Sequence, residues 1–147
     1  MSLAQWAKHG WLRPYVTNRS QVANLIAISD RDLVDAARGI SDDWKFGIAY
    51  NAVLKLCTVL LYCEGFRPEK NLAHYRTLPA LQLILGAERQ GDADYLEQCR
   101  AKRNITEYDS VGQISPEEAA DLLRFAHSFR AEVITWLAQH HAELTPF

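Results

Sequence analysis

The sequence predicts an all-α fold, a five-helix bundle with up-and-down core helices, in one domain that covers residues 1–147. Three observations predict it. The chain has 147 residues, which is within the usual size of a single domain. Apolar residues recur at three- and four-residue steps over long segments, as in amphipathic helices. The 7 glycines and 5 prolines fall mainly between these segments, which disfavours a many-turned β-sandwich.

The first two predicted helices cover residues 3–11 and 20–38. Pro14 closes the first helix off, because the residue before a proline is pushed out of the helical region. In the second helix, Gly39 stands where a left-handed glycine often ends a helix. The apolar face predicted for the second helix consists of Val22, Leu25, Ile26, Leu33, Val34 and Ala37.

The third predicted helix, residues 42–64, begins after an N-cap serine, Ser41, and ends at Gly65. Nearly all of its circumference is apolar, so we expect other helices to surround it. Lys55 near its centre opposes a membrane span. Its polar residues, spaced by four, four and three, form one narrow stripe of Gly47, Asn51, Lys55 and Thr58.

A polar stretch, residues 66–75, is predicted to be a loop, and no segment has a convincing strand pattern. A fourth helix is expected to start near Thr77 and Pro79, because proline suits a first turn. Gly86 and Gly91 interrupt this helix, which continues over residues 92–109.

The last helix has the clearest start signal in the sequence. Ser115 is a good N-cap, Pro116 suits the first turn, and Glu118 stands three residues after the cap. We expect the inner face of this helix to consist of Leu122, Ala126, Phe129, Val133 and Trp136.

Composition restricts the function classes. With 48% hydrophobic and 23% charged residues, the chain has the composition of a soluble globular protein. The formal net charge is −2, so any nucleic-acid binding must depend on a local basic patch, and no sequence-specific DNA readout is expected. The N-terminus has no signal-peptide pattern, and Cys57, Cys63 and Cys99 form no CxxC pair. We therefore expect reduced core thiols in a cytoplasmic protein that does not bind membranes.

Familiar cofactor and catalytic motifs are missing from the sequence. It contains no GxGxxG, P-loop, HExxH, GxSxG or EF-hand pattern. His140 and His141 are neighbours, but adjacent helical positions point about 100° apart and do not converge on one metal. We expect neither a cofactor nor a metal site.

One cluster of residues stands apart, within 100–109. Arg100, Asn104 and Tyr108 are four residues apart, which places them on one helix face. Together with Lys102 and Arg103 they form a plausible anion site, since arginine offers a rigid fork suited to phosphate. The alternative is an exposed basic face, with an Arg103–Glu107 pair and a tyrosine packed at the end of the bundle.

Arg103-Asn104 followed by Tyr108 resembles the Arg–polar–spacer–His motif of the HEPN superfamily (higher eukaryotes and prokaryotes nucleotide-binding), with tyrosine in place of histidine. Residues 47–54 resemble the helix that begins the core of that family. Gly65-Phe66 with His74-Tyr75-Arg76 is similar to the segment that follows. The likeness covers residues 42–136 and suggests a divergent bacterial branch.

The resemblance implies a small helical bundle and, in active members, a metal-independent ribonuclease whose arginine steadies phosphate while histidine transfers a proton. Tyrosine, with an ordinary pKa of about 10, is a poor base at neutral pH. We therefore expect a nucleotide- or RNA-binding module without ribonuclease activity, which binds through Arg100, Arg103, Asn104 and Tyr108. The resemblance also implies a homodimer and an antitoxin-like or nucleotidyltransferase partner.

Two alternatives stay open. One is a toxin-like endoribonuclease of a toxin–antitoxin pair, whose candidate catalytic residues are Arg103, Tyr108 and His74. His74 would supply the missing imidazole if the loop folds over the motif. The other is a protein-interaction bundle that binds no ligand.

Overall fold

A computed structural model describes residues 1–72, 76–108 and 111–147, without the side chains of Leu72, Glu107 and Tyr108. The described residues form six α-helices and one two-stranded sheet, so the predicted all-α helical bundle is confirmed. The elements are α1 (Leu3–Lys8), β1 (Leu12–Pro14), α2 (Arg19–Ala36), α3 (Asp42–Cys63), β2 (Phe66–Pro68), η1 (Lys70–Leu72), α5 (Ala80–Leu85), η2 (Ala87–Arg89), α6 (Gln90–Tyr108), α7 (Pro116–His140) and η3 (Ala142–Leu144).

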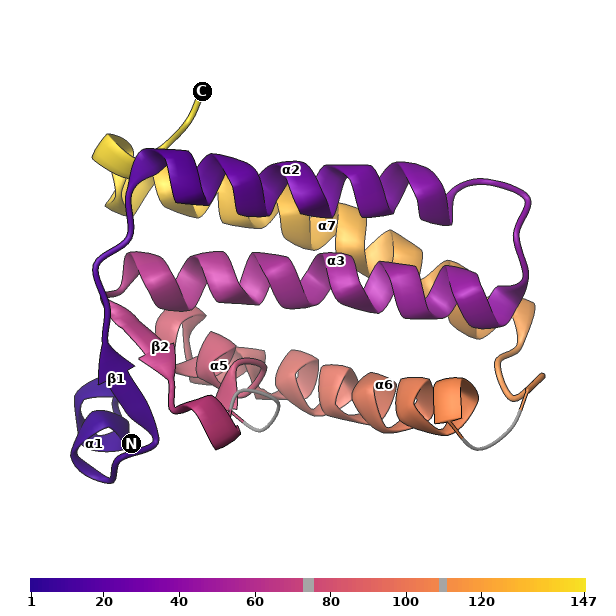
Figure 1. The fold of residues 1–147 in the computed structure, drawn as a ribbon, viewed down its shortest axis with the longest axis horizontal. Helices are drawn as coiled ribbons and strands as arrows, with labels where there is room; N and C mark the ends of the chain where they lie inside the picture. The colour runs from indigo at the N-terminus through magenta and orange to yellow at the C-terminus, as the bar shows by residue number, and fades with distance from the viewer. Residues whose placement is uncertain (73–75, 109–110) are drawn as a thin grey trace.

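The long helices α2, α3, α6 and α7 lie side by side, and consecutive ones run in opposite directions (Figure 1). Helix α3 is central and contacts α2, α5, α6 and α7. Among the described residues, it is the helix long and apolar enough to cross a bilayer, but 67% of its most apolar window is buried inside the bundle. That burial is expected of the core helix of a soluble protein, as predicted.

The predicted helix signals are confirmed at the starts of α3 and α7. The Ser41 side chain accepts a hydrogen bond from the Trp44 amide at 3.3 Å. Ser115 and Glu118 form a reciprocal capping box with both bonds at 3.1 Å. Gly65, at φ 90°, follows α3 in a left-handed conformation that favours glycine. The five predicted inner-face residues of α7 are all buried.

Several predicted boundaries and faces are wrong. Helix α1 ends at Lys8 rather than at residue 11, because the chain turns through Gly10 at φ 77° into β1. Gly39 is not a left-handed cap, since α2 ends at Ala36 with a right-handed Ala37 as its C-cap. Gly91 lies inside α6 and does not interrupt it, so the break is at Gly86 alone.

Val34 and Ala37 belong to the predicted buried face of α2 but are exposed. Val34 has 60% of its surface accessible. The last turns of α2 instead bury Leu33 and Ala36. In the last turns of α2, the face toward the core therefore contains Leu33 and Ala36 in place of the predicted Val34 and Ala37.

The prediction of no strand, with a loop at 66–75, is also wrong in part. Strand β1 pairs antiparallel with β2, and we call this pair the ribbon. Each strand has three residues and ends in a proline, so neither is long enough to show an alternating pattern. Trp6, Leu12, Leu61 and Ala80 form a small core cluster at this end of the molecule, and Leu61 joins it to α3.

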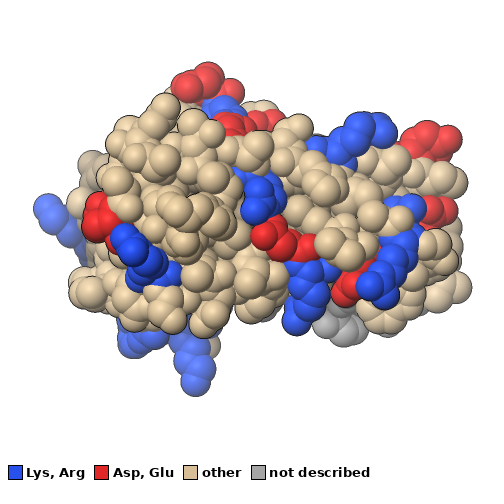
Figure 2. Space-filling view, turned by 90° about the horizontal axis from the view of Figure 1, so that it is seen from above, with Lys and Arg blue, Asp and Glu red and all other residues tan. Residues whose placement is uncertain are grey.

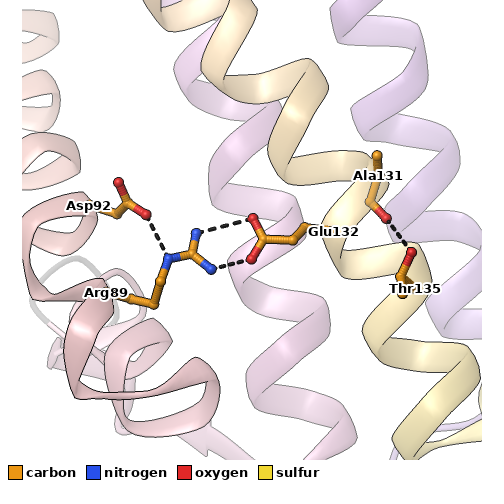
Figure 3. A network of polar contacts seen from close by, with 5 residues as sticks. All are labelled: Arg89, Asp92, Ala131, Glu132 and Thr135. Carbon is orange, nitrogen blue, oxygen red and sulfur yellow. Dashed lines mark hydrogen bonds and ion pairs between the residues drawn. The ribbon is translucent and has the colours of Figure 1, made fainter.

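Ion pairs fasten the long helices to one another. Arg89 donates to Asp92 at 2.7 Å and makes a two-pronged contact with Glu132, which ties the start of α6 to α7 (Figure 3). Asp30 of α2 accepts from Arg130 of α7 at 3.1 Å. On the face that Figure 2 shows, basic and acidic side chains are interspersed, in keeping with the small net charge.

Candidate anion-binding site

The three basic residues predicted to form the anion site, Arg100, Lys102 and Arg103 of α6, have different partners. Arg100 donates to Glu97, one turn earlier, at 2.5 Å. Lys102 instead pairs with Glu118 of α7. These two residues line a pocket of about 110 Å³ between α3, α6 and α7, which is well below the 300–1,000 Å³ typical of ligand pockets. Lys102 therefore joins two helices and is not part of one anion site with Arg100.

Arg103 packs against the central helix. Its guanidinium carbon lies 5.1 Å from the centre of the Tyr50 ring, which is cation–π distance. Its side-chain Nε is buried. The Arg103 side chain is thus half-buried against α3.

Tyr50 is the residue of this region that the sequence did not single out. It is only 1% exposed, and burial raises its pKa to about 12, an effect that the positive charges of Arg103 and Arg100 oppose. In the sequence, Tyr50 is part of the largely apolar circumference predicted for residues 42–64. A usable signal was present, because a buried tyrosine hydroxyl usually needs a polar partner.

We call Tyr50, Glu97, Arg100, Arg103 and Asn104 the α6 cluster. Arg103 lies over the Tyr50 ring, and the charges of Arg103, Arg100 and Glu97 all act on the pKa of the Tyr50 hydroxyl. Asn104 is half-buried one residue beyond Arg103. The structure therefore places Arg103 over α3, next to the predicted Asn104, and leaves the charge of Arg100 close enough to act on the same tyrosine.

Other predicted site residues fall outside the described part of the chain. This holds for His74 and for the side chains of Tyr108 and Glu107, so the Arg103–Glu107 pair is not described either. Among the described residues, no group of three His, Cys, Asp or Glu side chains could hold a metal ion. All three cysteines are free and buried, as expected of core thiols.

The four described histidines make their contacts elsewhere. His9 stacks on Trp11 with ring centres 4.6 Å apart. His140 and His141 lie against Trp136, and His127 lines a shallow pocket between α2 and α7. None of these contacts brings a described imidazole to the α6 cluster.

Comparison with known proteins leaves the family undecided. No family model, curated protein or solved structure matches this chain, and its place in the HEPN superfamily stays a prediction from the residues of its motif.

Proposed function

We propose that the chain is a helical-bundle module that binds a nucleotide or RNA through phosphate and does not cleave it. The observation that carries this proposal is the position of Arg103 over the buried ring of Tyr50, a tyrosine on which the charge of Arg100 also acts. Among the described side chains acting on that tyrosine, Glu97 is the carboxylate set against the two arginines, which leaves a local excess of positive charge.

In this proposal the two arginines bind phosphate oxygens, and Asn104 adds amide hydrogen bonds. Arginine suits this role because its planar fork matches phosphate and keeps its charge at all relevant pH values. Arg100 would exchange its Glu97 contact for the ligand, while Arg103 is already positioned by the Tyr50 ring. Tyr108 is the predicted fourth contact.

The proposed absence of cleavage is supported by the state of Tyr50. With a pKa of about 12, its hydroxyl keeps its proton at neutral pH and can donate a hydrogen bond but not accept a proton from a ribose.

The test is a fluorescence titration with nucleotides and with short RNA. Arg103→Ala is expected to weaken binding about tenfold or more, as loss of a charge-assisted hydrogen bond does. Arg38→Ala removes a 70% exposed cation from the loop after α2 and is the matched control. Equal binding by wild type and Arg103→Ala would contradict the proposal. RNA degradation without metal, or growth arrest on overexpression that Arg103→Ala relieves, would favour the toxin-like ribonuclease instead.

A second candidate, a protein-interaction bundle that forms a homodimer, is favoured by apolar side chains at one end of the molecule. Trp44 is 64% exposed at the start of α3, and Ile40 just before it is 37% exposed. Val111 is 84% exposed, and the next amide, that of Gly112, donates to Asp43 at 2.7 Å. Sedimentation should then find a dimer that Trp44→Ser dissociates; a wild-type monomer at high concentration would exclude this candidate.

A further inference from the structure

A second group of basic residues lies on the ribbon, in segments that precede α6 in the sequence. A surface pocket of about 420 Å³ is lined by Arg13, Tyr62, Arg67, Pro68 and Lys70. These residues come from β1, the end of α3, β2 and η1. The volume is within the range of small-molecule sites. We call it the ribbon pocket.

The strand register places two like charges side by side. Arg13 is directly opposite Arg67, and opposite residues of a strand pair project to the same face. Like charges in this position destabilise a sheet. A local arrangement that costs stability is most often found where a protein needs it for function.

The contacts of the two arginines hold them in place without neutralising the pocket. Arg13 donates to Glu69 at 2.7 Å, although its own side chain stays 54% exposed. Arg67 lies over the Tyr15 ring at 5.4 Å. Three cations, Arg13, Arg67 and Lys70, thus line the pocket, and the described contacts pair Arg13 with a carboxylate, that of Glu69.

The aromatic side of the pocket is the ring of Tyr62, against which the Tyr15 ring packs. The rings of Tyr15 and Tyr62 lie 4.6 Å apart, centre to centre, and Gln21 donates to the Tyr15 hydroxyl at 2.6 Å. Tyr62 lines the pocket and is half-buried, and burial raises its pKa, so the ring stays uncharged. An uncharged, fixed ring beside cations is a stacking surface for a nucleobase.

The ribbon pocket continues onto the central helix. A smaller hollow of about 150 Å³ shares Tyr62 and Pro68 with it, and Lys55 and Thr58 also line this hollow. Both belong to the polar stripe of α3 that the sequence showed and that the proposed function does not use. The stripe thus adds a fourth cation and a hydroxyl beside the same tyrosine.

We propose that the ribbon pocket binds a nucleoside phosphate, with Arg67, Lys70 and Arg13 on the phosphate and Tyr62 against the base. Proteins that bind single-stranded nucleic acids without sequence preference place cations along the phosphate backbone and stack the bases on aromatic rings. The same chemistry can come from a free nucleotide or from a single strand of RNA. The proposal does not rest on the α6 cluster, with which it shares no residue.

The test is calorimetric titration with adenosine monophosphate, adenosine, inorganic phosphate and a short single-stranded RNA. Wild type should bind adenosine monophosphate about tenfold or more tightly than adenosine or phosphate alone, because both parts of the site are used. The double variant Arg67→Ala, Lys70→Ala should lose at least about tenfold in affinity. Tyr62→Ala should lose roughly tenfold and Tyr62→Phe little, because stacking needs the ring and not the hydroxyl.

The matched control is Arg38→Ala, Arg124→Ala, which removes two cations that are each 70% exposed elsewhere. An equal loss in this control would show a general charge effect and overturn the proposal, as would phosphate binding as tight as that of the nucleotide. Tighter binding of RNA than of the mononucleotide would identify single-stranded RNA as the ligand.

The variant Arg103→Ala separates the two proposals. It should leave the affinity of the ribbon pocket for the mononucleotide unchanged and weaken only the binding at the α6 cluster. Arg67→Gln, which keeps the side-chain bulk, repeats the test if the double variant fails to fold.

Discussion

The α6 cluster and the ribbon pocket are built from the same residue types, arginine beside tyrosine, but bury them to different depths. In the α6 cluster the tyrosine is buried and the arginines are half-buried over it. In the ribbon pocket the tyrosines are half-buried and Arg13, Arg67 and Lys70 are exposed. Arg103, whose aromatic partner is inside the core, therefore contributes to the stability of the fold, whereas the exposed cations of the ribbon pocket contribute little to it.

The largest effect expected from this difference is on folding. Tyr50→Ala should lower the free energy of unfolding by about 3–5 kcal/mol, because it empties a fully buried aromatic site. Tyr62→Ala should cost only about 1–2 kcal/mol, since the ring is already partly in contact with water. Urea denaturation of both variants measures the two values, and equal losses would remove the contrast between the regions.

The second expected effect is on the alkaline stability of the protein. Tyr50 has a pKa of about 12 when folded and an ordinary 10.0 when unfolded. Its stabilising contribution, about 3 kcal/mol, is therefore complete below pH 10 and is lost as the pH rises toward 12. Denaturation at several alkaline pH values should show a shallower decline in Tyr50→Phe than in wild type. Parallel curves would show that Tyr50 is not buried as described.

The third effect concerns the arginines themselves. Arg103→Ala should cost about 1–2 kcal/mol in unfolding free energy, because it removes a partly desolvated cation–π contact with Tyr50. Arg103→Lys should recover part of the loss. Thermal unfolding compares both with wild type. A neutral Arg103→Ala would mean that the arginine serves only a ligand and not the fold.

The smallest effect is expected at Arg67. Arg67→Ala should change the unfolding free energy by no more than about 0.5 kcal/mol, because the relief of like-charge repulsion with Arg13 offsets the loss of its contact with Tyr15. The same variant is expected to weaken nucleotide binding. A large loss of stability would instead show that Arg67, like Arg103, contributes to the fold.

The helices could be predicted because their signals are local. Ser41 and the Ser115–Glu118 box cap the next few amides, and the polar stripe of α3 is visible within four turns. The inner face of α7 followed from the 3.6-residue period in the same way. The shared face of Arg100 and Asn104 is also a property of one helix.

The ribbon and its pocket could not be predicted, because they depend on contacts between distant segments. β1 and β2 each have three residues, too few for a periodic signal, and their pairing sets Arg13 opposite Arg67. Tyr50 and Tyr62 occur on one apolar helix, with nothing in the local pattern to distinguish them.

The sequence by itself determined the fold class, the central helix and the cluster of cations at the end of α6, since each depends on spacing within one segment. Only the tertiary structure decided which cations are engaged. It turned Lys102 to Glu118, laid Arg103 over Tyr50, and left Arg67 at the mouth of a pocket. The physical reason is that the energy of a charge depends on its partners and its access to water, and both are fixed by packing between elements.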